Sequence, residues 1–223
     1  MDTPSVVVFD VNETLSDMAP LGRRFLDVGA TDATAQIWFA SLLRDAFALT
    51  AAGGTEKFAV MGSEGLRTVL AGVQLDRDLD AAIEHVMSGF MALEVHPDVP
   101  EGIRALKGTG RRLVTLSNGS AAVAERLLTG AGVREEFERL LSVEDEGVWK
   151  PARGSYAYAA EVCGVDLSDM MLVAVHPWDI DGAARAGMQT AFINRSGRPY
   201  PGYFTAPTHT VTALPELAGR LTG

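Results

Sequence analysis

The stretch VVVFDVNETLSD, residues 6–17, decides the fold of this chain. Its apolar run at 6–9, three β-branched valines and a phenylalanine, stops at Asp10 and gives way to polar residues. Three later runs have the same form, and they are LVTL at 113–116, MLVAV at 171–175 and TAFIN at 190–194. Short continuous apolar runs that end in polar residues are typical of strands buried on both faces of a parallel sheet. The sequence therefore predicts a parallel sheet built from these strands.

Helical periodicity fills the segments between the later runs. Asp98 stands where an N-cap is expected, before the apolar residues of 103–106. The same period recurs at 121–128 and at 156–162. Alternation of strand and helix predicts an α/β fold with a Rossmann-like, doubly wound parallel sheet, and its functional site is expected beyond the carboxyl ends of the strands.

The pattern changes after the first run, where helix follows helix and no strand-like run appears. Thr31 or Asp32 can cap a long helix whose apolar face should be buried. That face is expected to hold the i, i+4 stripe Phe39, Leu43 and Phe47, broadened by Trp38, Leu42 and Leu49. We therefore expect a Rossmann-like catalytic core formed by residues 1–16 and 97–223, with a helical cap subdomain, residues 17–96, inserted after the first strand.

Composition limits the classes of partner. The 223 residues carry 19 basic and 29 acidic side chains, a formal net charge of −10. Such a charge repels phosphate backbones and anionic lipid, so neither nucleic acid nor membrane is an expected partner, while a small anionic substrate can still bind a locally positive pocket. Cys163 is the single cysteine, which excludes a disulfide framework. With no signal peptide or membrane-length apolar run in the sequence, a cytoplasmic protein is expected.

Polar side chains follow the ends of the predicted strands. They are Asp10, Asn12 and Thr14 after the first run, Ser117 and Asn118 after the second, Lys150 before a proline, and His176 with Asp179 after the third. Each alone has an ordinary explanation, such as a helix cap, a turn or a solvated charge. Carboxyl ends of parallel strands meet at one edge of a sheet, however, so these side chains should lie together. Two carboxylates, a lysine and a Ser–Asn pair at one edge predict an active site.

Four segments resemble, in order and spacing, the motifs of the haloacid dehalogenase superfamily. They are FDVNETLSD (9–17), LVTLSNGS (113–120), VWKP (148–151) and VAVHPWDIDGAARAG (173–187). The segments SNGS, LLSVED (140–145), KPARGSYAYAAE and PWD are most similar to the type II 2-haloacid dehalogenase branch. The resemblance implies a hydrolase that acts on carbon–halide bonds of short 2-haloacids, such as haloacetate and 2-halopropionate, with fluoroacetate as a further candidate.

The resemblance also implies covalent catalysis by Asp10. In this family the carboxylate displaces halide and forms an ester, which water then hydrolyses at the aspartyl carbonyl. Lys150 is expected to hold the pKa of Asp10 down, and Asp179 to orient Lys150 or activate the hydrolytic water. Further contacts to the nucleophile or the substrate carboxylate are expected from Thr14, Ser117 and Asn118. Tyr156 matches a family position near the substrate.

Two positions depart from the phosphatases of the superfamily. The phosphatases carry a second aspartate two residues after the nucleophile, where this chain has Asn12. They also carry an acid at the position of Val175. Asparagine cannot deliver a proton, and valine offers no oxygen ligand to Mg²⁺. We therefore expect neither a metal nor a cofactor. A Mg²⁺-dependent phosphohydrolase and a non-catalytic family member stay open as alternatives.

Further departures concern the substrate and the histidine. Phe39 stands where the branch presents a cap arginine that grips the substrate or the halide, and we place it with Asn12 among the expected substrate contacts. Other arginines of the cap are Arg23, Arg24 and Arg44. His176 stands where the branch has asparagine. Beside Asp179 it could act as base for the hydrolytic water, donate to a leaving halide, or hold the loop. The resemblance also implies a homodimer.

Overall fold

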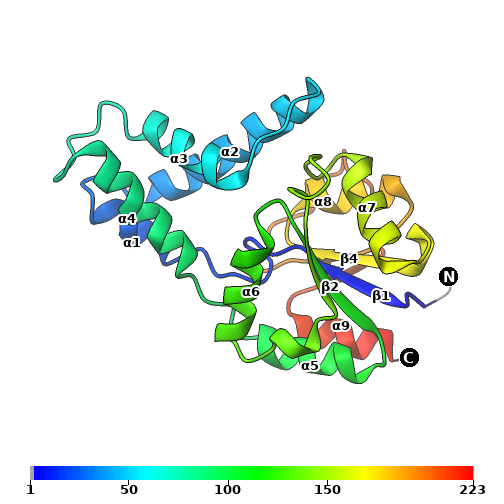
Figure 1. The fold of residues 1–223 in the computed structure, drawn as a ribbon. Coiled ribbons are helices and arrows are strands. Elements are labelled where there is room, and N and C mark those ends of the chain that lie inside the picture. The colour runs from blue at the N-terminus through cyan, green and yellow to red at the C-terminus, as the bar shows by residue number, and fades with distance from the viewer. Residues whose placement is uncertain (1–2, 223) are drawn as a thin grey trace. The chain divides into compact units, whose positions relative to one another are not determined.

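The computed structural model describes residues 3–222 of the chain. The chain divides into two compact units, Met1–Ser16 together with Val95–Gly223, and Asp17–Glu94. The first unit combines a parallel sheet with helices, and the second consists of helices and their connections (Figure 1). All the side chains that the strand ends were expected to bring together belong to the first unit.

The α/β unit is built on a six-stranded parallel sheet in the order β3-β2-β1-β4-β5-β6. Its strands are β1 Val6–Phe9, β2 Arg112–Ser117, β3 Arg139–Ser142, β4 Met170–Ala174, β5 Gln189–Ile193 and β6 His209–Val211. β1 lies between β2 and β4, with Val8 opposite Val114 and Leu172. β1 and β4 are buried at every residue, which explains their uninterrupted apolar runs. The predicted Rossmann-like, doubly wound α/β fold is confirmed.

Strands β3 and β6 have no counterpart among the apolar runs of the sequence. β3 begins at the exposed Arg139, and in the three-residue strand β6 only Val211 is buried. Both elements lie at an edge of the sheet, where a strand is covered incompletely. Their sequences therefore lack the continuous apolar run that marks a central strand.

Helices cover both faces of this sheet. They are α5 Val99–Gly108, α6 Ala121–Gly130, α7 Arg153–Cys163, α8 Pro177–Ala186 and α9 Leu214–Leu221, with 3₁₀ turns at Arg134–Glu136 and Leu167–Asp169. α5 and α9 pack together on one side of the sheet, and α7 and α8 on the other (Figure 1). The main hydrophobic core joins Val7 and Phe9 of β1 to apolar side chains of α5, α6 and α9. This packing fixes the end of β1, where Asp10 follows.

Asp98 differs from its expected role. Helix α5 does begin at the next residue, but the Asp98 side chain makes no capping hydrogen bond. Its Oδ1 instead accepts from Arg195 at 2.7 Å, and its Oδ2 accepts from the backbone N–H of Leu214 at 2.9 Å. Asp98 therefore joins the start of α5 to the segment after β5 and to the start of α9. The local sequence suggests a helix cap because Arg195 and Leu214 are distant along the chain, and a local pattern does not record them.

The helical unit contains α1 Leu21–Leu26, α2 Ala33–Ala51, α3 Phe58–Val69 and α4 Leu79–Met91. Asp32 caps α2, since its Oδ1 accepts from the backbone N–H of Ala33 at 2.8 Å. Trp38 of α2 is fully buried and donates from Nε1 to the carbonyl oxygen of Gly62 at 2.9 Å. Among residues 3–222, no helix is both long and apolar enough to traverse a bilayer.

The buried face of α2 lies slightly aside from the expected stripe. Its buried residues are Ala35, Trp38, Phe39, Leu42 and Ala46. Leu43, Phe47 and Leu49 are only partly buried. The buried face is centred nearer Trp38, because the Trp38 ring packs against α3 at its glycines. A Cβ added at Gly62 would lie 3.5 Å from that ring. Periodicity alone could not distinguish these neighbouring stripes.

Candidate active site

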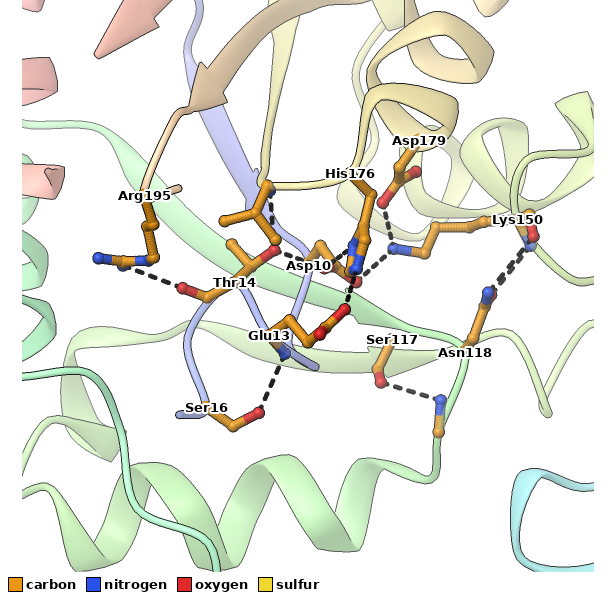
Figure 2. A network of polar contacts seen from close by, with 12 residues as sticks. Asp10, Glu13, Thr14, Ser16, Ser117, Asn118, Lys150, His176, Asp179 and Arg195 are labelled. Atoms are coloured by element: carbon orange, nitrogen blue, oxygen red, sulfur yellow. Dashed lines mark hydrogen bonds and ion pairs between the residues drawn. The ribbon is translucent and has the colours of Figure 1, made fainter. Parts of the chain in front are cut away.

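Asp10 lies at the carboxyl end of the central strand β1, 4% exposed, where neighbouring loops converge (Figure 2). Its Oδ1 accepts a hydrogen bond from Lys150 Nζ at 2.9 Å. Its Oδ2 accepts from the Thr14 hydroxyl at 2.5 Å and lies 3.1 Å from His176 Nδ1. Burial alone would raise the pKa of Asp10, but the charge of Lys150 and the His176 contact hold it well below its usual value. Asp10 is therefore ionised at neutral pH.

Lys150 is fully buried between two carboxylates. Its Nζ lies 2.6 Å from Asp179 Oδ2 in addition to its contact with Asp10. Burial would lower the pKa of Lys150, but the two negative charges raise it above its ordinary value, so the ammonium stays charged. The Lys150 ammonium bridges Asp10, the candidate nucleophile, and Asp179. The sequence predicted that these side chains lie together at the carboxyl edge of the sheet.

Asn118 differs from the expected substrate contact. Its Oδ1 accepts from the backbone N–H of Lys150 at 2.9 Å, and its Nδ2 donates to the carbonyl oxygen of Lys150 at 3.3 Å. The Asn118 amide therefore binds both the N–H and the carbonyl oxygen of Lys150 and fixes the backbone position from which the lysine side chain extends. Ser117 likewise serves its own turn, since its Oγ accepts from the backbone N–H of Gly119 at 2.9 Å (Figure 2). A contact from Asn118 or Ser117 to substrate stays a prediction.

Asp179 lies in the first turn of α8, buried against α7. Its Oδ1 accepts from the Tyr156 hydroxyl at 2.6 Å. Burial raises the pKa of Asp179 despite the opposing charge of Lys150, and burial and the Asp179 charge raise the pKa of Tyr156 well above its usual value. Gly182 permits this approach, because a Cβ there would lie 2.6 Å from the tyrosine hydroxyl. Tyr156 therefore contacts the second acid in this structure.

His176 contacts different carboxylates from the one expected. Its Nδ1 faces Asp10, and its Nε2 lies 2.8 Å from Glu13 Oε2. The ring also stacks on Trp178, with centroids 5.0 Å apart. Burial would lower the pKa of His176, but the hydrogen bonds and charges of Asp10 and Glu13 raise it to about 10. His176 is thus a cation at neutral pH, which argues against the expected role as a base.

Glu13 is the residue of this site that the sequence did not reveal. Its backbone has a φ of 62°, in the left-handed region that favours glycine. Its backbone N–H donates to Ser16 Oγ at 3.2 Å, and its carbonyl oxygen lies 3.0 Å from His96 Nε2. Nothing in a linear sequence marks a glutamate as left-handed, although its place three residues after Asp10 is a signal in hindsight.

Asn12 and Phe39 complete the expected set. Asn12 is buried, two residues after Asp10. Phe39 is buried in the helical unit beside Trp38, with ring centroids 6.3 Å apart. Of the cap arginines, Arg44 pairs with Asp45 on the surface. The substrate contacts expected of Asn12 and Phe39 stay predictions.

The donor set does not fit Mg²⁺. Asp10 and Asp179 are already bridged by the Lys150 ammonium, and Val175 offers its backbone N–H to Thr14 Oγ1 at 3.1 Å rather than an oxygen ligand. Across residues 3–222, no group of three or more His, Cys, Asp or Glu side chains is arranged to hold a metal ion.

Known proteins share both sequence and fold with this chain. A family model for haloacid dehalogenase-like hydrolases matches residues 4–187. The (S)-2-haloacid dehalogenase 4A of Burkholderia cepacia is 30% identical over 97% of this chain and 94% of its own length. The haloacetate dehalogenase H-2 of Moraxella sp. (strain B) is 30% identical over 81% of this chain and 80% of its own. The crystal structure of the L-2-haloacid dehalogenase RSc1362 matches with a TM-score of 0.92 and 27% identity over 100% of both chains.

Proposed function

The chain belongs to the haloacid dehalogenase-like hydrolases, and on that premise we propose that it releases halide from short 2-haloacids through an ester on Asp10. The observation that carries the proposal is the nucleophile itself. Asp10 is a buried carboxylate held ionised by Lys150, and covalent catalysis requires such an activated group. The names of the relatives from Burkholderia and Moraxella support 2-haloacids and haloacetate as the substrate class.

The first step is a displacement. An oxygen of Asp10 attacks the halogen-bearing carbon, the new C–O bond forms as the carbon–halogen bond breaks, and halide leaves with the electron pair. Burial aids this step because a carboxylate stripped of most of its water attacks more readily than a hydrated one. The Lys150 ammonium keeps Asp10 deprotonated without removing its charge.

Water then hydrolyses the ester at the Asp10 carbonyl carbon. Asp179 is the base that we assign to this step. A base works best when its pKa approaches the operating pH, and burial raises the pKa of Asp179 in that direction. Tyr156 and Lys150 fix its two carboxylate oxygens. The hydroxy acid leaves, and Asp10 returns to the carboxylate state by releasing the remaining proton of the water to solvent.

We extend the proposal to the rest of the chain. The reaction needs no metal, because Lys150 supplies the positive charge between the carboxylates. The helical unit acts as a cap subdomain, and its Phe39 contacts the substrate. Ser117, Asn118 and Asn12 of the core also contact the substrate. We also propose a cytoplasmic homodimer.

Halide release tests the proposal. Chloroacetate, fluoroacetate and each enantiomer of 2-chloropropionate are incubated with the enzyme in EDTA, and halide is measured by ion chromatography. We expect release that survives chelation and disappears in Asp10→Asn, whereas Asp45→Asn, a surface change in the helical unit, keeps wild-type turnover. If no haloacid is turned over and phosphate esters are hydrolysed once Mg²⁺ is added, the chain is a phosphohydrolase of the same fold.

A further inference from the structure

The two oxygens of Asp10 have different surroundings. Oδ1 accepts one hydrogen bond, from Lys150, whereas Oδ2 faces two donors, Thr14 and His176. A carboxylate oxygen has two lone pairs, so within the described residues Oδ1 keeps one lone pair open and Oδ2 has both engaged. Oδ1 is therefore the atom placed to attack the substrate, and Oδ2 becomes the carbonyl oxygen of the ester.

The contacts of His176 define its protonation. Each ring nitrogen faces a carboxylate oxygen, Nδ1 at 3.1 Å from Asp10 and Nε2 at 2.8 Å from Glu13. Ionised carboxylates only accept hydrogen bonds, so both nitrogens must carry a proton. The other charged groups around the nucleophile are Lys150 and, beyond it, Asp179. The ring is thus an imidazolium between two anions, in line with its raised pKa of about 10.

The backbone of Glu13 indicates that this contact has a function. A glutamate at a φ of 62° is strained, and strained residues persist where a site requires their placement. The hydrogen bond that the Glu13 N–H donates to Ser16 Oγ, and the contact of its carbonyl oxygen with His96 Nε2, hold that conformation. The result is a carboxylate aimed at the outer nitrogen of His176, on the side away from Asp10 (Figure 2).

We propose that His176 is a permanently charged catalytic residue that stabilises the oxyanion formed when the Asp10 ester is hydrolysed, and that Glu13 is the positioning residue that keeps it charged. The inference rests on the proposed ester mechanism and deepens it. It assigns His176 no proton transfer, neither from the hydrolytic water nor to the leaving halide, since both of its N–H groups are engaged by carboxylates.

In the second step, the hydrolysis of the Asp10 ester, negative charge develops on Oδ2. Water attacks the Asp10 carbonyl carbon and passes a proton to Asp179, while the carbonyl electron pair moves onto Oδ2. The oxyanion on Oδ2 receives hydrogen bonds from the Thr14 hydroxyl and His176 Nδ1. When the carbonyl re-forms, the bond from the carbon to Oδ1 breaks, and the hydroxy acid leaves with Oδ1 and takes the proton from Asp179. The Asp10 carboxyl, which now holds the water oxygen in place of Oδ1, releases its remaining proton to solvent and is again a carboxylate. Charge grows on the oxygen where the structure has placed two donors.

Single-turnover kinetics of His176→Ala provide the first test. Loss of one oxyanion donor slows such reactions about 100- to 1,000-fold, so we expect hydrolysis to slow by that factor while the first halide is released at nearly the wild-type rate. The ester should then accumulate on Asp10 and be visible by intact-protein mass spectrometry. The halide burst also reports folding, because an unfolded variant has none. Matched variants are His209→Gln, on the edge strand β6, and Glu161→Gln, exposed on α7, and both should retain wild-type rates.

The pH profile of Glu13→Gln separates a charged donor from a base. Without its outer carboxylate, the pKa of His176 should fall from about 10 toward its ordinary value of about 6.5. Hydrolysis should therefore weaken as the pH rises through neutrality in the variant, while the wild type holds its rate to near the higher pKa. Glu13→Gly removes the same charge and also the backbone strain, so the same profile in both variants assigns the effect to charge.

If His176 acted as a base, loss of the Glu13 charge would raise activity near neutral pH instead of lowering it. If Glu13→Gln gained activity near neutral pH, or if the hydrolysis step of His176→Ala matched the wild type, the inference would be overturned. Failure of the proposed function is distinct, because the wild type itself would then release no halide from any haloacid. A wild-type burst with unchanged variants rejects only the role given to His176 and Glu13.

Discussion

Replacing Lys150 by methionine should destabilise the protein strongly, and more so at high pH. The Lys150 ammonium is 0% exposed and lies 2.9 Å from Asp10 Oδ1 and 2.6 Å from Asp179 Oδ2. At an effective dielectric constant of about 20, each contact is worth about 6 kcal/mol before desolvation is subtracted. Removal of one member of a buried ion pair typically costs about 3–5 kcal/mol net, because the partners stay buried without their counter-charge. We expect a loss of that size at pH 7.

The pH dependence follows from the carboxyl groups that remain. Without the ammonium, the folded-state pKa of Asp179, already raised by burial, rises further above its unfolded value of about 3.9. A carboxyl with a raised folded pKa adds stability at low pH and loses it as the pH rises through the folded pKa. The cost of the Lys150→Met substitution should therefore grow from pH 5 to pH 8, by up to about 1.4 kcal/mol per pH unit.

Urea unfolding at several pH values measures this cost. Trp149 and Trp178 both lie in the α/β unit, so tryptophan fluorescence can follow its transition, and the midpoint and slope give the free energy of unfolding. Lys107→Met, at an exposed position of α5, is the matched control and should stay within about 0.5 kcal/mol of the wild type. A cost for Lys150→Met that equals the control, or that does not change with pH, would refute the reasoning.

Three other outcomes are expected. Thr14→Val removes a donor 2.5 Å from Asp10 Oδ2, so ester hydrolysis in a single turnover should slow about 100-fold with the halide burst retained, and an unchanged hydrolysis rate would contradict this. Gly182→Ala places a Cβ 2.6 Å from the Tyr156 hydroxyl and should cost about 1–3 kcal/mol in thermal unfolding, whereas Gly219→Ala, in helix α9 with open space around it, should be neutral or stabilising. A single turnover in ¹⁸O-labelled water should leave the label in Asp10, and label found in the product instead would indicate direct attack on the substrate carbon.

Much of the fold and part of the site follow from local patterns in the sequence. The runs at β1, β2, β4 and β5 are visible because a strand covered on both faces must be apolar throughout. The convergence of Asp10, Lys150 and Asp179 is also predictable, since parallel strands present their carboxyl ends at one edge. Edge strands were missed because partial exposure leaves them without that pattern.

The tasks of several polar residues could not be predicted. Asn118 grips the backbone of Lys150, and Asp98 binds Arg195 and Leu214, although each follows or precedes an element that suggests an ordinary turn or cap. A hydrogen bond depends on the position of both partners in space. When those partners are separated by many residues, no local pattern records the pairing.

The sequence by itself determined an α/β sheet, a helical insertion and an ionisable carboxylate at a strand end, because hydrophobic periodicity and strand polarity are properties of neighbouring residues. Only the tertiary structure decided the state of His176. Its charge comes from Asp10 and from Glu13, whose left-handed backbone turns a carboxylate toward the outer ring nitrogen. A pKa is set by the charges and solvent within a few ångströms, and those neighbours exist only once the chain has folded.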